Sequence, residues 1–250
     1  MAKYLILLAL VSLLILTGFT IIGPIEQNPA YHHFADQRTM IGLPNALNVL
    51  SNIAFLMAGL YGLLTLRHLS LNRAYRLLSQ IFFIGLILTS VGSAYYHLSP
   101  TNETLVWDRI PMTVSFAAFC SFIIAVFIKE SAGPKILWLL LPVSISSVLY
   151  WGYSERMGQG DLRFYLLVQF LPLVLTPLVL WVSPRQPVIK RNIWIILGLY
   201  SVAKLAEYFD GPLFLLLGMS GHTLKHLISA LTAIVFVATL SLLSTHRNHD

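Results

Sequence analysis

The chain has 250 residues, of which 57% are hydrophobic and only 10% are charged. A soluble domain carries about 25% charged residues, so this composition excludes an ordinary soluble protein and indicates a polytopic membrane protein. The formal net charge of +6 is also typical of nucleic-acid-binding proteins. Here, however, the basic residues lie in short loops between apolar runs, as membrane topology predicts, and we expect no nucleic-acid partner.

Apolar runs follow one another along the chain, each near the ~20 residues that a helix needs to cross a bilayer. The first, 4–22, follows Lys3. We interpret it as an uncleaved helix rather than a secretory signal, because it is long and lacks a small-residue cleavage site. The others are predicted at 45–66, 75–97, 109–128, 135–153, 163–183, 192–210 and 222–244. No alternating pattern indicates a membrane barrel.

The predicted fold is therefore an all-α polytopic membrane protein. Residues 1–44 would form an extra N-terminal transmembrane helix and an outer loop, and residues 45–250 a domain with a core of seven transmembrane helices. No composition shift divides this second region, so we expect a single domain there.

Loop charges predict the orientation. With the N-terminus inside, ten Lys and Arg residues lie inside, four lie outside and two lie within the runs. The outer four are Arg38, Arg109, Arg156 and Arg163. An excess of cations on one side marks the cytoplasmic side, so the N-terminus is predicted to be cytoplasmic.

Three histidines lie at helix ends that this topology brings to the outer side: His97 closes one run, and His222 and His226 open another. An imidazole in a bilayer is costly unless it is paired, so such a cluster is a candidate functional site. His222 and His226 are four residues apart and share a helix face. Three histidines that leave a fourth position open are typical of catalytic zinc sites.

The pair His222 and His226 has other interpretations. Its sequence, HTLKH, lacks the glutamate of the HExxH motif, and two polar residues at this spacing can also bond to neighbouring helices. A haem would need ligands on facing helices, so a pair on one helix fits zinc better.

Ser93 and Asp108 accompany His97 in the stretch GSAYYHLSPTNETLVWD. Ser93 lies four residues before His97 and shares its helix face. The serine could instead bond to a backbone carbonyl of its own helix. Asp108 and Arg109 could form a surface pair that opens a helix. The occurrence of all these residues at one membrane depth favours a site.

Two more polar groups are predicted to face the interior of the bundle. The stretch NALNVLSN supplies Asn45, Asn48, Ser51 and Asn52. In lipid such side chains bond across helices, and we expect them to support the metal ligands. Lys204 and Glu207 can pair three positions apart, and binding of a lipid head group is their alternative role.

The pattern Ser93-x3-His97, ten residues to Asp108 and a late His222-x3-His226 resembles the alkaline ceramidases. It is similar also to the wider superfamily of seven-helix membrane hydrolases that includes the adiponectin-receptor proteins. The stretch from Asn48 to Asn52 looks like the opening of their first core helix, and the resemblance covers residues 45–244.

The resemblance implies a zinc ion held by His97, His222 and His226, with Ser93 and Asp108 as catalytic residues beside it. Two features depart from the family. Lys225 stands where the eukaryotic enzymes have an aromatic residue before the last histidine. Their acidic calcium-binding segment is replaced by YHHFADQRTMIGLPN, which does not support calcium as a cofactor.

On this resemblance we expect a zinc-dependent amidase that hydrolyses the N-acyl amide of ceramide-like membrane lipids to a sphingoid base and a fatty acid. Asp108 would act as the base and Ser93 as a donor to the oxyanion. The active site would lie at the outer, periplasmic or lumenal, side. The alternative is a non-enzymatic seven-helix lipid receptor or sensor in which zinc only joins helices.

Overall fold

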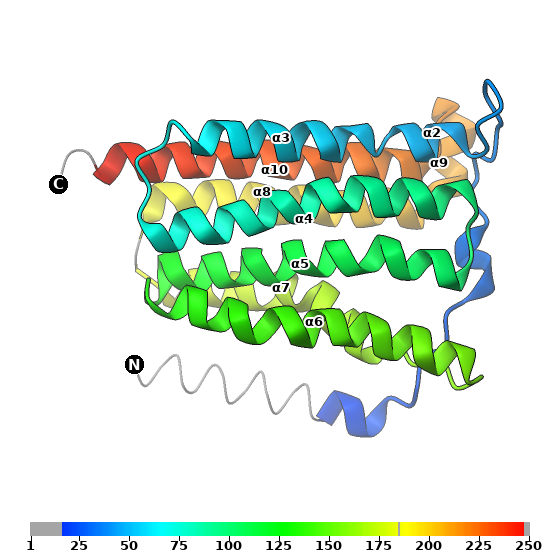
Figure 1. Cartoon of the computed structure of the whole chain (residues 1–250), viewed down its shortest axis with the longest axis horizontal. Helices are drawn as coiled ribbons and strands as arrows, with labels where there is room; N and C mark the ends of the chain where they lie inside the picture. Colours follow the sequence, from blue (N-terminus) through cyan, green and yellow to red (C-terminus); the bar gives the residue numbers. More distant parts are fainter. Residues whose placement is uncertain (1–16, 185, 248–250) are drawn as a thin grey trace.

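The structure, a computed structural model, describes residues 17–184 and 186–247, and this part of the chain is helical without strands (Figure 1). Its long helices lie side by side with their axes along one direction. In chain order the elements are η1 (Pro29–His32), α2 (Ala46–Leu50), α3 (Ile53–Leu66), α4 (Arg73–Leu98), α5 (Asn102–Phe127), α6 (Ala132–Arg156), α7 (Arg163–Val182), α8 (Pro187–Tyr208), α9 (Asp210–Leu217) and α10 (Gly221–Arg247).

Within the described residues, six spans are long and apolar enough to cross a membrane. They are Ala46–Leu66, which joins α2 and α3, together with α4, α5, α6, α7 and the stretch Gly221–Thr245 of α10. The protein is therefore all-α and of the integral membrane type, as the composition predicts. The helix α8 lies along α10 but is not among these spans, because Lys190, Arg191, Lys204 and Glu207 make it too polar.

The predicted count of seven helices plus one is not confirmed. Each of the seven later runs is a helix, and α8 is the one whose charges set it apart from the six apolar spans. Of the first run, 4–22, residues 4–16 lie outside the described residues, and residues 17–21 are helical.

The helix α5 begins earlier than the hydrophobic pattern predicts. A capping box starts it, in which the Thr101 hydroxyl accepts from the Thr104 backbone N–H and the Thr104 hydroxyl accepts from the Thr101 N–H. Such a box satisfies two N–H groups that a helix start otherwise leaves free. Asp108 therefore lies nearly two turns inside the helix and not directly before its start, as the predicted run 109–128 places it.

Aromatic packing joins α10 to α4 and α5 in the middle of the bundle. The Phe236 ring of α10 lies 4.7 Å from that of Phe82 and 5.7 Å from that of Phe83, both on α4. On α5, the rings of Phe122 and Phe119 lie 4.8 Å and 6.0 Å from it. Tilted and edge-on rings at these distances attract one another beyond their burial. This cluster fixes the first turns of α10 beside the last turn of α4.

We call the end of the bundle where α4 ends and α5 and α10 begin the site end; α2 and α9 mark it at the right of Figure 1. Nearer the middle of the bundle, α3 approaches α4 closely through Gly59. A Cβ atom at Gly59 would lie 2.9 Å from the Phe83 carbonyl oxygen and 2.6 Å from Ile87 Cγ1. Small residues allow such close approach between membrane helices.

Substitution of Gly59 tests this approach. Gly59→Ala should lower the free energy of unfolding by about 1–3 kcal/mol, because the added methyl group pushes α3 away from α4. Gly198→Ala is the matched control, since Gly198 lies in α8 with nothing within 4 Å of the added atom. The control should be neutral or stabilising by up to about 1 kcal/mol. Thermal unfolding in detergent measures both, and equal midpoints would contradict the packing of α3 on α4.

Candidate metal centre

Three imidazoles from two helices meet at the site end. His97 lies in the last turn of α4, and His222 and His226 lie in the first two turns of α10. The ring centroids are 4.8 Å, 5.0 Å and 4.9 Å apart, which forms a nearly equilateral triangle. One ring nitrogen from each lies within 4.8 Å of the other two, so the three residues could hold one metal ion.

The bonding of His97 supports a metal. Its ring is completely buried, and neither Nδ1 nor Nε2 has a hydrogen-bond partner in the described part of the chain. A buried polar atom without a partner costs about 1–3 kcal/mol. An ion at the centre of the triangle would bind the free lone pair of this ring, so the residues present fit a metal.

The hydrogen bonds of Ser51 decide the tautomer of His226. The Ser51 hydroxyl donates its single proton to the carbonyl oxygen of Asn48, at 3.0 Å. Its oxygen then accepts from Nδ1–H of His226, at 2.8 Å. The lone pair of His226 is therefore on Nε2, where it is free to bind a metal. Metal-binding histidines are commonly oriented in this way by a bond to the other ring nitrogen.

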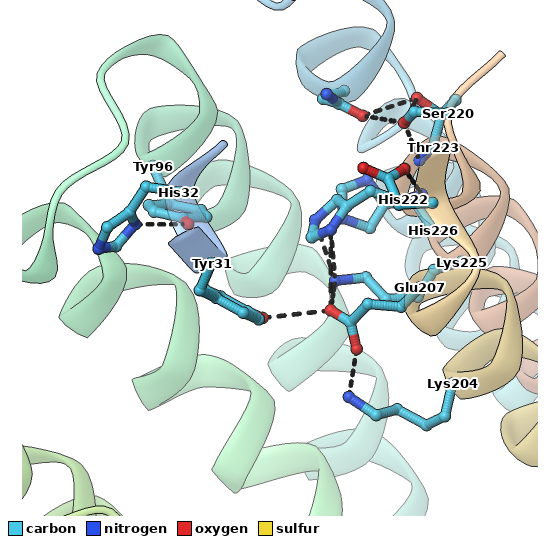
Figure 2. A network of polar contacts seen from close by, with 12 residues as sticks. Tyr31, His32, Tyr96, Lys204, Glu207, Ser220, His222, Thr223, Lys225 and His226 are labelled. Atoms are coloured by element: carbon cyan, nitrogen blue, oxygen red, sulfur yellow. Dashed lines mark hydrogen bonds and ion pairs between the residues drawn. The ribbon is translucent and has the colours of Figure 1, made fainter. Parts of the chain in front are cut away.

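The asparagine stretch supports the same ligands, as expected. The Asn48 side-chain oxygen accepts from the hydroxyls of Ser220, at 3.0 Å, and Thr223, at 2.7 Å (Figure 2). This ties α2 to the first turn of α10. Asn45 donates to the backbone carbonyl of His97, at 2.9 Å. The stretch thus holds the starting turn of α10 and the last turn of α4 in place.

A segment of the N-terminal loop covers the triangle. The Phe34 ring lies 4.7 Å from the rings of both His97 and His222. His32 is not part of the triangle, since its two ring nitrogens bond to the Tyr96 hydroxyl and the Asn102 side-chain oxygen, each at 2.9 Å. The Phe34 ring therefore lies over two of the three histidines, and no periodic signal in the loop sequence predicts this contact.

Ionic contacts hold the covering segment. Arg38 forms an ion pair with Asp36 at 2.7 Å, and hydrogen bonds from its guanidinium hold the pKa of the Asp36 carboxyl below its usual value. Asp210 accepts from the backbone N–H of Ala35, at 2.7 Å, and from that of His222, at 2.9 Å. One carboxylate therefore fixes both the cover and the start of α10.

Glu207 of α8 is the centre of a charged network beside the histidines (Figure 2). It pairs with Lys204, as predicted, and also with Lys225 at 2.7 Å. Burial raises the pKa of the Tyr31 phenol well above its usual value, so the hydroxyl stays protonated and donates to Glu207, at 3.2 Å. The Lys225 ammonium also lies 3.0 Å from Nε2 of His222. Lys225 is not among the site residues that the sequence predicts, because no helical spacing links it to Glu207.

A cavity begins beside the histidine triangle and is lined by residues of α3, α4, α5, α7, α8 and α10. Its polar end includes Ser93, Asp108 and His226, and phenylalanines of α3, α4 and α5 line its apolar part. Ser93 lies beside Asp108, and its hydroxyl interacts with the carboxylate. Asp108 and Arg109 are 6% and 5% exposed, which overturns their interpretation as a surface pair.

The structure therefore brings the five candidate residues into two adjoining groups. His97, His222 and His226 form the triangle, while Ser93 and Asp108 line the cavity together with His226. The direct contact between the rings leaves no room for a haem plane between His97 and the other two histidines. Comparison with protein-family models and with curated proteins finds no match for this chain.

Removal of each ligand tests the metal centre. Purified protein should contain one divalent ion per chain by elemental analysis. His97→Ala, His222→Ala and His226→Ala should each lower the metal affinity more than about 100-fold, because loss of a residue that only orients a ligand already costs ~10–100-fold. His33→Ala is the control, since His33 is exposed in the covering segment. Full metal content in a triad variant would contradict the site.

The role of Ser51 gives a second test. Ser51→Ala should weaken metal binding by about 10–100-fold, because Nδ1–H of His226 loses its acceptor. Ser90→Ala removes a similarly buried hydroxyl that bonds only to the Ile87 carbonyl of its own helix. The metal affinity of this control should match that of the wild type in a competition titration with a chelating dye. Equal affinities in both variants would mean that Ser51 does not orient His226.

Proposed function

We propose that this protein is a zinc-dependent membrane hydrolase that cleaves the N-acyl amide of ceramide-like lipids into a sphingoid base and a fatty acid. The observation that carries the proposal is the position of Ser93 and Asp108. They lie at the polar end of a cavity that also contains His226, a member of the buried histidine triangle. An acid–base group and a hydroxyl beside a three-histidine site are the parts that metal-assisted hydrolysis needs.

The donor set favours zinc. Three neutral imidazoles with one open position are the protein ligands of catalytic zinc sites. Zinc bound there would polarise the amide carbonyl and make water a stronger nucleophile near neutral pH.

Asp108 has the chemistry of the general base. Its carboxylate takes a proton from the attacking water as the new C–O bond forms at the amide carbon. The same group then gives that proton to the nitrogen as the C–N bond breaks, so that a free amine and a fatty acid leave. A carboxylate that performs both steps must be shielded from bulk water beside the reacting carbon. Asp108 is shielded in this way, because its side chain is buried and 6% exposed.

Ser93 has the chemistry of an oxyanion donor. The carbonyl oxygen gains negative charge as water adds, and a fixed hydroxyl donor at that point lowers the barrier. Removal of such a donor in other enzymes costs about 3 kcal/mol. Ser93 is 1% exposed and lies on the same face of α4 as His97, one turn away.

The rest of the cavity suits an acyl chain. Phe55, Phe82, Leu86 and Phe116 line it, and they come from three different helices. Apolar walls with a few polar groups at one end are typical of lipid-sized binding sites. Because the loop cations gather on the opposite side, we infer that this polar end faces the periplasm or lumen and that the N-terminus lies in the cytoplasm.

Hydrolysis of a labelled lipid tests the proposal. Wild-type protein should release fatty acid from ceramide, a chelator should stop the reaction, and zinc should restore it. Asp108→Asn should lower kcat by about 100-fold or more while the metal stays bound, because the base is lost and the ligands are not. Asp161→Asn is the control: Asp161 is equally buried at the site end, but it pairs with Arg163 outside the cavity.

A receptor with a structural metal is the second candidate, and the cover of Phe34 over His97 and His222 favours it. If the wild-type protein is a receptor, it will bind zinc and lipid yet release no fatty acid. Undiminished turnover in Asp108→Asn would instead contradict the role of this residue as the base.

A further inference from the structure

Arg109 is a buried cation for which the proposed chemistry has no use. It lies in α5 directly after Asp108, is 5% exposed and lines the same cavity. Its guanidinium carbon lies 4.1 Å from the ring centre of Trp151, 4.5 Å from that of Tyr165 and 5.7 Å from that of Tyr31. Three aromatic rings thus surround a charge that most proteins leave at the surface.

The guanidinium is only partly satisfied. Nη2 donates to the Gln27 side-chain oxygen, at 2.7 Å, whereas Nη1 is buried and has no hydrogen-bond partner in the described chain. None of the ion pairs among the described residues includes Arg109. A buried charge without a counter-ion is strongly unfavourable, and buried arginines are normally paired.

The carboxylates that share the cavity are already engaged. Glu207 accepts from Lys204, Lys225 and Tyr31. Asp108 interacts with Ser93 and is attracted by both Lys225 and Arg109, so its single negative charge is shared between two cations. The wall of the cavity therefore carries the cations Arg109, Lys204 and Lys225 against the carboxylates of Asp108 and Glu207. An excess of positive charge in a largely apolar cavity favours an anionic ligand, and a divalent metal at the histidines would increase that excess.

We propose that Arg109 binds an oxyanion, a carboxylate or a phosphate, in the head group of the lipid that occupies the cavity. The Gln27 bond and the aromatic rings fix the plane of the guanidinium, so its free edge is ready to receive such a group. This inference rests on the proposed function, and it specifies that, among ceramide-like lipids, those with an anionic head group bind most tightly. A released fatty acid is a less suitable partner, because its carboxylate forms at the reacting carbon, beside Ser93 and the histidines.

Binding of uncleavable probes tests the inference without turnover. Octadecyloxyacetate and octadecyloxyethyl phosphate carry the two oxyanions on an ether-linked chain, and octadecyloxyethanol is their neutral match. Wild-type protein with its metal, in nanodiscs of neutral lipid, should bind both anionic probes at least about tenfold more tightly than the alcohol, as expected for a buried hydrogen bond to a charged group. Displacement of a fluorescent fatty alcohol reports all affinities.

The variants separate charge from packing. Arg109→Met should reduce the ratio of anionic to neutral affinity to about one, and Arg109→Lys should retain part of it because the charge remains. Arg156→Met is the control, since Arg156 lies exposed at the same end of the bundle and outside the cavity, and its ratio should equal that of the wild type. A folding defect would weaken all probes alike, so the ratio within each variant stays informative, and metal content verifies the fold.

An unchanged ratio in Arg109→Met would overturn the inference. Stearate, a fatty acid with its carboxylate directly on the chain, is a fourth probe. If the wild type prefers stearate but neither of the two ether-linked anions over the alcohol, the inference also fails. These outcomes are independent of hydrolysis. If the ratio falls as expected but no amide is cleaved, the proposed function fails and the anion site stands. If ceramide is cleaved and the ratio is one in the wild type, the anion site fails alone.

Discussion

A polar side chain between apolar helices must find a partner within the protein, because neither lipid nor packed side chains can solvate it. This requirement organises the site end of the bundle. Ser51 accepts from His226, Asn45 donates to the carbonyl of His97, and Asp210 accepts from the first turn of α10. In the described chain, the buried side-chain atoms that still lack partners include the ring nitrogens of His97 and Nη1 of Arg109, besides single oxygens of Asn52, Ser79 and Thr176. The free nitrogens of His97 fit a metal ion, and the free Nη1 of Arg109 supports the proposal of an anion site.

Packing far from the site makes these contacts possible. The Phe236 cluster joins α10 to α4 and α5 near the middle of the bundle, and Gly59 lets α3 approach α4. Since helices are stiff, a fixed crossing at the centre determines where their ends lie. The two histidines at the start of α10 therefore meet the one at the end of α4, although 125 residues separate His97 from His222.

Charge balance links the metal centre to the cavity. Glu207 forms ion pairs with two lysines, one of which is in contact with His222. Without that carboxylate, Lys225 would repel a cation held by the histidines. Arg109 forms no ion pair among the described residues and shares the charge of Asp108 with Lys225, so its charge is only partly compensated. The same low-dielectric space thus holds three histidines that could bind a cation and, one helix away, the buried cation of Arg109.

The sequence by itself determined the helices and the pairs within them. Runs of about twenty apolar residues, the spacing from His222 to His226 and that from Ser93 to His97 are local patterns, because a helix repeats every 3.6 residues. The charges of the loops predicted that the candidate residues lie at one end of the helix bundle. Only the tertiary structure decided that Phe34 covers the histidines, that Lys225 pairs with Glu207 and that Arg109 is buried among aromatic rings. Each of these contacts joins segments that are far apart in the sequence. The periodicity within one segment does not predict which side chain of another segment it will contact.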